Sequence, residues 1–301
     1  MLAIRYTCMV SVFCFSAWAC SAEPSGSVVA NAGASGSEEA DASDSGTIAG
    51  DGGQSVDGAV IPTEPRHRGF VNVQLMDYPP QSSGSISASF VKSGDQSSCT
   101  QTKSGSCTVL DCTGSGSTTV YASAGAMTVG TPSTTLSVPQ SGYYSRTDSS
   151  SVPYGVGDNL NVHFTGAEVP AFDTTLHLPP RMLVTAPLPA DREVTMRVPA
   201  NQDFRLRWRA FSGALAEVRM TASLGANRSL SFLCSYDGAL GAASIPATLI
   251  AQMRGARAGL STMSLQESSK VVGAWDISVA SRTMAMKADG APYSVIVDVE
   301  P

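Results

Sequence analysis

The sequence lacks the short motifs that mark the common catalytic chemistries. It contains no G-x-S-x-G, no H-E-x-x-H and no G-x-x-x-x-G-K-[ST], the patterns of serine hydrolases, zinc peptidases and phosphate-binding loops. Histidine is scarce, and nothing in the sequence groups His67, His163 and His177. We therefore assign no catalytic residue and expect a non-enzymatic protein. The alternatives are an exported hydrolase whose site assembles only in three dimensions and a purely structural surface protein.

Metal-ligand spacing is also lacking. Cys107 and Cys112 are separated by four residues, not by the two of a C-x2-C pair, and no histidine lies at ligand spacing near them. No metal site and no cofactor are predicted. The folded part of the chain has no marked excess of basic charge, because 17 acidic and 18 basic residues follow from Pro65 onward. A domain this close to neutral is not expected to bind nucleic acid.

The N-terminus lacks an apolar run long enough to span a membrane, which takes roughly 20 residues. It has the three parts of a secretory signal instead. These are the charge of Arg5, the apolar segment 10–15, and the small residues Ala17 and Ala19 at cleavage-site spacing. The sequence thus predicts that residues 1–19 are a signal peptide and that the protein is exported.

The residue after the signal decides how the mature chain is held. Ala17-Trp18-Ala19-Cys20 resembles the lipobox of bacterial lipoproteins, which implies that Cys20 becomes the first residue and carries acyl chains such as palmitate. Ser21 lacks the acidic character that often marks retention in the inner membrane, so the outer membrane is the expected location. The same residues fit an ordinary A-x-A cleavage site, and free secretion is the alternative.

Residues 20–64 lack basic charge altogether. Eight acidic residues and no lysine or arginine fall there, among many Ala, Gly and Ser residues. Such a segment buries too little apolar surface to offset its ordering entropy, so we expect a disordered acidic tether. As a flexible coil it would hold the next domain about 35–40 Å from the anchor. Residues 65–301 are then the folded part, as one domain or two.

Four of the seven cysteines remain once Cys8 and Cys14 of the signal and Cys20 are set aside. In an oxidising compartment, this even set predicts two disulfides with three possible pairings. Cys234 falls on an inward position of a predicted strand, so its partner is expected near the hairpin of residues 99–110. The disulfide candidates are Cys99, Cys107, Cys112 and Cys234.

Alternation of apolar and polar residues is the dominant pattern of the folded part. Residues 71–75 read Val-Asn-Val-Gln-Leu, and about a dozen segments with the strand period of two follow. They predict an all-β fold, an antiparallel β-sandwich, with a β-barrel as the alternative. One short helix is predicted over 244–254, where apolar residues follow helical spacing. Residues 139–158 are predicted to be a long turn-rich loop.

Two surfaces stand out from this background. If the four strands between 194 and 236 pair in order, their outward residues form an arginine ladder that could bind phosphate or an acidic glycan. Its members are Arg197, Arg205, Arg207, Arg209 and Arg219. A solvated face, or an acidic tether folded back onto the arginines, is the alternative. The predicted loop carries three tyrosines suited to stacking on sugar rings, unless they tuck against the sandwich. They are Tyr143, Tyr144 and Tyr154.

The whole plan resembles the predicted lipoproteins common in myxobacteria. The likeness rests on Ala19-Cys20, the tract 21–64, the cluster of three early cysteines, and Phe232-Leu233-Cys234. The likeness concerns architecture and no specific motif. It implies an envelope location, with membrane contact through a lipid anchor, and it assigns no activity to the protein. The expected function is binding of an anionic ligand, a glycan or a partner.

Overall fold

The computed structural model describes residues 67–78, 81–92, 99–114, 119–149, 151–189, 194–225 and 227–301. The predicted signal peptide, Cys20 and the predicted tether lie outside the described residues. Arg66–Pro301 group into one compact unit. Among the described residues, no helix is long and apolar enough to cross a membrane.

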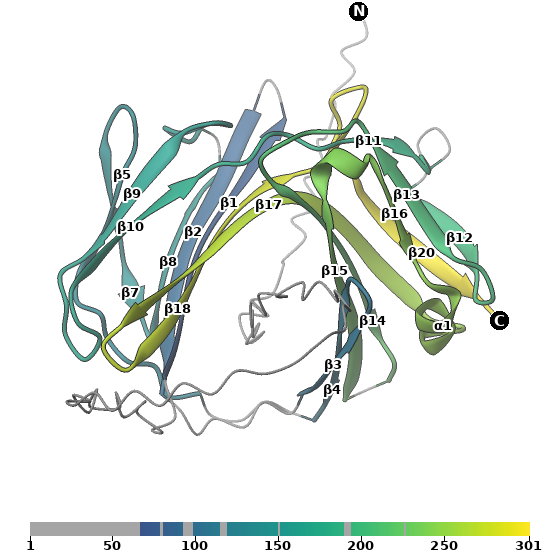
Figure 1. The fold of residues 1–301 in the computed structure, drawn as a ribbon, viewed down its shortest axis with the longest axis horizontal. Helices are drawn as coiled ribbons and strands as arrows, with labels where there is room; N and C mark the ends of the chain where they lie inside the picture. The colour runs from purple at the N-terminus through teal and green to yellow at the C-terminus, as the bar shows by residue number, and fades with distance from the viewer. Residues whose placement is uncertain are drawn as a thin grey trace, which may run out of the picture. The chain divides into compact units, whose positions relative to one another are not determined.

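Most of the described chain is β-structure, as predicted, and twelve strands form one large sheet (Figure 1). They are β1 (His67–Tyr78), β2 (Gln81–Val91), β3 (Cys99–Ser104), β4 (Cys107–Thr113), β7 (Gln140–Ser141), β8 (Tyr143–Asp148), β12 (Thr195–Pro199), β14 (Leu215–Ser223), β15 (Arg228–Asp237), β17 (Arg257–Val272), β18 (Trp275–Met284) and β20 (Ser294–Glu300). Their order is β3-β4-β15-β14-β17-β18-β1-β2-β8-β7; β20 pairs with β17, and β12 pairs with β20.

Two smaller sheets of four strands each complete the β-structure. The first has the order β10-β9-β5-β6 and consists of β5 (Met127–Gly130), β6 (Thr135–Val138), β9 (Asn159–Phe164) and β10 (Phe172–His177). The second has the order β16-β13-β11-β19 and consists of β11 (Leu183–Ala186), β13 (Phe204–Trp208), β16 (Ala242–Ile245) and β19 (Met286–Lys287). None of the three strand orders returns to its first strand, so the described strands form sandwich-like layers and not a closed barrel.

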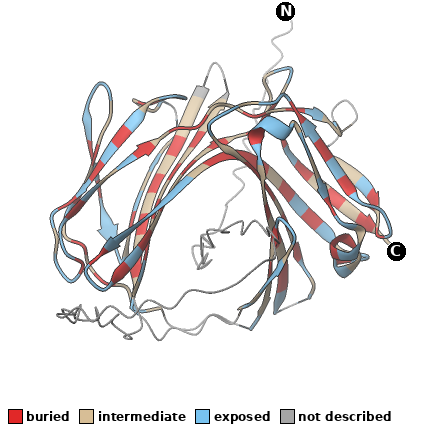
Figure 2. Cartoon of the chain, viewed as in Figure 1, coloured by how far each residue is buried: buried red, intermediate tan, exposed pale blue. Residues whose placement is uncertain are grey.

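Both small sheets lie on the same side of the large sheet, one toward each end (Figure 1). The alternation of side chains along β17 also places both small sheets on one side of the large sheet. Ala258 and Leu260 belong to one buried cluster and Val272 to the other, and all three occupy even positions of one strand. Side chains two residues apart share a face, so one face of the large sheet supplies both cores. Figure 2 shows the resulting alternation of buried and exposed positions along the strands.

The core under β5, β6, β9 and β10 is built around aromatic rings, and we call it the aromatic core. Phe90 of β2 lies at its centre. Its ring meets Tyr144, Phe164, Phe172 and Trp275 edge-on, with centroids 5.3–6.1 Å apart. All five side chains are buried. Edge-to-face contacts of this kind add to the hydrophobic stabilisation from burial.

The core under β11, β13 and β16 contains a covalent link, and we call it the disulfide core. Cys107 of β4 and Cys234 of β15 are register partners, both buried, and form a disulfide. A second disulfide joins Cys99 and Cys112 across β3 and β4. Both predicted bridges are therefore present, and Cys234 pairs with an early cysteine as expected. Disulfides indicate an oxidising compartment outside the cytoplasm.

A polar seam separates the two cores in the middle of the large sheet. The chain crosses it between β10 and β11. There the Ser281 hydroxyl donates to the carbonyl of His177, and the Thr283 hydroxyl donates to that of Pro179 at 2.9 Å. Arg181 of the crossing segment forms an ion pair with Asp77 of β1. These contacts hold the connection between the two small sheets in place.

The short helix predicted over 244–254 is confirmed, and it is shorter than the predicted range. It consists of α1 (Ala247–Ile250) and η2 (Ala251–Met253), because residues 242–245 pair with β13 as β16. The predicted loop 139–158 contains β7 and β8, because its residues extend the edge of the large sheet.

Candidate functional site

Three arginines follow one another along β13, and we call them the arginine stripe. Arg205 and Arg207 take the exposed positions of a strand whose alternate apolar residues are buried. Arg209 is exposed directly after the strand, where its backbone N–H donates to the carbonyl of Leu183 at 2.8 Å. Alternate residues of a strand are about 6.6–6.8 Å apart, so the side chains leave the backbone in a regular row.

The neighbours of the stripe are small and uncharged. On β16, Ser244 is the register partner of Arg205, and Ala242 is that of Arg207. On β11, Ala186 is opposite Arg207. Short side chains on both flanking strands leave the guanidinium groups room to bind a molecule from solvent.

Little negative charge offsets the stripe. The carboxylate of Asp203 is 4.0 Å from the Arg205 guanidinium, at the limit of an ion pair. Its other oxygen accepts a hydrogen bond from the backbone N–H of Ala247, at the start of α1. Within the described ranges, Arg207 and Arg209 form no ion pair. Like charges on neighbouring positions repel one another, so a bound anion would relieve an existing electrostatic cost.

The other two arginines of the predicted ladder lie elsewhere. The four strands between 194 and 236 do not pair in order, because β12 joins β20 and β13 joins a separate sheet. Arg197 lies opposite Asp298, whose carboxylate is also 3.5 Å from Arg257. Arg219 belongs to β14 and pairs with Glu217. The ladder of five is thus corrected to a stripe of three.

The three tyrosines do not form a stacking loop. Tyr144 is buried in the aromatic core, where its hydroxyl donates to the carbonyl of Gly125 and accepts from the N–H of Ala124. Tyr154 is buried as well, and Tyr143 is half-buried beside Tyr121. Tyr143 and Tyr144 are neighbours on β8, and side chains alternate between the two faces of a strand, so Tyr144 points into the core.

Two of the three histidines lie on the outer side of β9 and β10. His163 Nδ1 is 2.7 Å from the Asp173 carboxylate, and both side chains are exposed. His177 is hydrogen-bonded to Asn159 at 3.0 Å. No described hydroxyl or thiol side chain is hydrogen-bonded to His163, so the pair lacks the nucleophile of a hydrolase triad. In the described part of the chain, no three His, Cys, Asp or Glu side chains gather as metal ligands.

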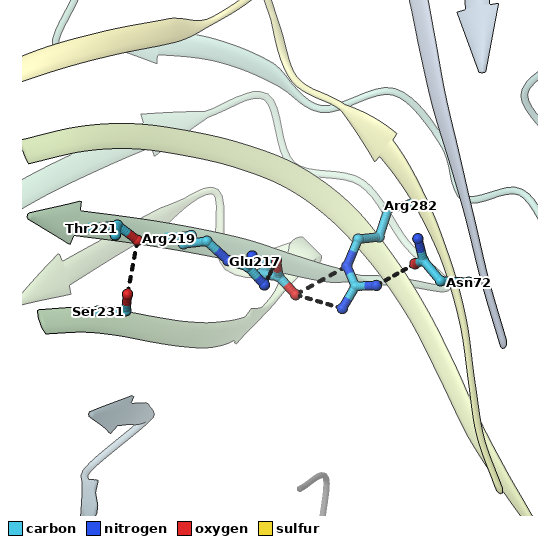
Figure 3. A network of polar contacts seen from close by, with 6 residues as sticks. All are labelled: Asn72, Glu217, Arg219, Thr221, Ser231 and Arg282. Carbon is cyan, nitrogen blue, oxygen red and sulfur yellow. Dashed lines mark hydrogen bonds and ion pairs between the residues drawn. The ribbon is translucent and has the colours of Figure 1, made fainter. Parts of the chain in front are cut away.

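A second polar cluster lies on the other face of the large sheet, and we call it the Glu217 cluster (Figure 3). Glu217 is 1% exposed, and its Oε2 is 3.4 Å from both Nε and Nη2 of Arg282. Arg282 also donates to the amide oxygen of Asn72. The guanidinium of Arg219 is 3.8 Å from Glu217 Oε1. The cluster therefore joins β14, β18 and β1.

Register places this cluster on the face opposite both cores. Glu217 is the partner of Met263, and Arg282 is the partner of Leu265, so all four share one face. Met263 and Leu265 are buried although they belong to neither core. They lie on β17, between the strands of Glu217 and Arg282, and form the apolar floor of the cluster.

Sequence reasoning found only part of these sites. Arg219 was a candidate, but Asn72 and Arg282 were missed. Their positions in the chain are far apart, and only the pairing of β14, β17, β18 and β1 brings them together. The alternation of Glu217, Arg219 and Thr221 along one strand was the available signal for a polar outer face.

Comparisons with known proteins add no family to this description. No protein-family model matches the chain, and no significantly similar sequence was found among curated proteins.

Proposed function

We propose that this protein is an exported, non-enzymatic binding protein of the cell envelope. Its ligand is anionic, a phosphorylated or acidic glycan, and it binds to the arginine stripe. The observation that carries the proposal is the row of exposed guanidinium groups at Arg205, Arg207 and Arg209, with small neighbours and one distant carboxylate. Guanidinium groups bind phosphate and carboxylate oxygens through paired hydrogen bonds.

The same proposal includes a lipid anchor at Cys20 in the outer membrane. Its support is the signal-like segment 1–19, the cysteine directly after Ala19, and the acidic tract that follows. An anchored binding domain would keep its ligand at the cell surface. Intact mass of the protein from the membrane fraction tests the anchor: added acyl mass on a chain that begins at Cys20 supports it, and an unmodified N-terminus contradicts it.

Binding is tested with the exported full-length chain on an array of phosphorylated, sulfated, carboxylated and neutral glycans. We expect the charged glycans to bind and the neutral ones to leave the arginine stripe unoccupied. The variant Arg205→Gln/Arg207→Gln/Arg209→Gln should lose roughly tenfold or more in affinity for the anionic glycans, since a hydrogen bond to a charged group is worth about 1.5–3 kcal/mol.

A matched variant separates a specific site from bulk charge. Arg197→Gln/Arg254→Gln/Arg257→Gln removes the same three charges from exposed positions outside the stripe. We expect its affinity to stay within about threefold of the wild type, because distant surface charges are largely screened at physiological salt. Equal losses in both triple variants, or no binding of any anionic glycan, would reject the proposal.

A further inference from the structure

The positive charge of the arginine stripe forms a line and not a compact patch. Its three side chains occupy every second residue, so neighbouring Cα atoms are about 6.6–6.8 Å apart and the outer two are about 13 Å apart. The flanking strands β16 and β11 contain no charged residue. The positive charge therefore extends along β13 and does not continue sideways onto either neighbour.

The line has a defined length. Before it, the carboxylate of Asp203 is 4.0 Å from the Arg205 guanidinium, and a hydrogen bond from the backbone N–H of Ala247 holds this carboxylate in place. An anionic group placed beyond Arg205 would be repelled by it. After Arg209, the next basic residue in the chain is Arg219, which belongs to β14 of the large sheet. A ligand that uses the whole stripe thus presents three anionic groups in a row.

A single anionic group is a poor match for this arrangement. It can lie between two neighbouring guanidinium groups, but gathering all three around it would bring three like charges together. A chain that repeats its charge meets one guanidinium after another. Each contact then holds the next anionic group close to its partner, which raises the overall affinity. All three side chains are exposed, so such a chain can reach them from solvent.

We infer that the ligand of the arginine stripe is a linear glycan with an anionic group on every sugar, and that it lies along β13 with successive anionic groups on the three arginines. The inference rests on the proposed function and narrows it, because a glycan with one terminal charge would satisfy that function but not this geometry. Arginine side chains have several rotatable bonds, so the sugar repeat need not equal the spacing of alternate strand residues.

The test measures affinity as a function of ligand length. Two series of one to six sugars, oligogalacturonates and sulfated oligoglucosides, compete with a fluorescent long chain of the same kind for the exported full-length protein. In at least one series we expect affinity to rise at least tenfold from one sugar to four, because further charges engage the stripe. From four sugars to six it should change less than threefold, because the stripe ends.

Salt dependence counts the charges in contact. For single-stranded polyanions, the logarithm of the affinity falls with the logarithm of the salt concentration with a slope of about −0.7 for each neutralised charge. For the four-sugar ligand we therefore expect a slope of about −2 with the wild type and about −1.4 with Arg207→Gln. Arg254→Gln, which removes an exposed charge outside the stripe, is the matched control and should leave the slope unchanged.

The outcomes separate this inference from the proposed function. Equal affinity for one sugar and four, with both lost in Arg205→Gln/Arg207→Gln/Arg209→Gln, would overturn the linear ligand and leave an anion site on the stripe. An equal change of slope in Arg207→Gln and Arg254→Gln would also overturn it. Binding of neither series, or binding that the triple variant does not weaken, would reject the inference and the proposed function together.

Discussion

The two ends of the large sheet are stabilised in different ways. The aromatic core gathers the rings around Phe90 and contains no cysteine. The disulfide core has fewer rings in contact and a covalent bond between Cys107 and Cys234 at its buried face. One continuous sheet is thus stabilised by ring packing at one end and by a covalent link at the other.

Topology explains why the bond lies where it does. The hairpin of β3 and β4 joins the large sheet only through β15, although 127 residues separate Cys107 from Cys234. Closing so long a loop costs much entropy, and a disulfide removes that cost from the unfolded chain. The β1–β2 hairpin needs no such bond, since β18 and β8 flank it on both sides.

Removal of the buried disulfide should cause the largest loss of stability among the changes that distinguish the two cores. For Cys107→Ala/Cys234→Ala we expect the free energy of unfolding to fall by about 5 kcal/mol, from the length of the closed loop. Urea unfolding measures it. The control Cys99→Ala/Cys112→Ala opens a separation of 13 residues and should cost about 3 kcal/mol. Equal losses would show that loop length is not the cause.

A smaller loss is expected at the centre of the aromatic core. Phe90→Leu keeps an apolar side chain but removes four ring contacts, so it should cost about 3 kcal/mol. Phe232→Leu is the matched change in the disulfide core, where the phenylalanine is equally buried, and should cost about 1 kcal/mol. The same urea experiment compares them. A larger loss for Phe232→Leu would contradict the role assigned to the rings.

High pH should weaken the aromatic core through Tyr154. Burial, with the nearby Asp148 carboxylate, raises the pKa of Tyr154 to about 12, from about 10 in an unfolded chain. The unfolded state then releases its proton first, so stability is complete below pH 10 and falls by about 2 kcal/mol as pH rises toward 12. Unfolding of wild type and Tyr154→Phe across this range measures it. An identical decline in both proteins would contradict the assignment.

Low pH should reduce stability only slightly, and it should do so at the end of the large sheet that contains the disulfide core. Arg228 donates two hydrogen bonds to Asp111, at 2.9 and 2.7 Å, and these hydrogen bonds lower the pKa of the Asp111 carboxylate. Their contribution is complete above the unfolded pKa of about 4 and disappears as pH falls through the lower folded pKa. The stability difference between wild type and Arg228→Gln should therefore shrink below pH 4. Acid unfolding curves of the two proteins decide the point, and a gap that widens in acid would refute it.

The sequence was sufficient for the strands that alternate clearly and for the four disulfide cysteines. Residues 71–75 and 230–236 have apolar side chains at every second position, which is a local signal of a half-buried strand. The length of β17 was not predicted. Residues 266–270 of this strand are polar, and they lie between the part that belongs to the disulfide core and Val272, which belongs to the aromatic core.

The pairing of distant strands was beyond the sequence. Nothing local indicates that β1 lies parallel to β18, or that β13 leaves its neighbours in the chain to join β11 and β16. This pairing separates Arg197 and Arg219 from the stripe, and it brings Glu217 to Arg282. Of the candidate sites, the local row at Arg205, Arg207 and Arg209 was predictable, and the contacts across strands were not.

The most direct measurement of the central proposal is amide hydrogen exchange of the exported chain with and without a saturating phosphorylated or acidic glycan. If the arginine stripe is the binding site, exchange slows in β13 and β16, residues 204–208 and 242–245, while β14 and β15 are unchanged. Slower exchange confined to other strands, or no change anywhere in the presence of the glycan, would contradict the account.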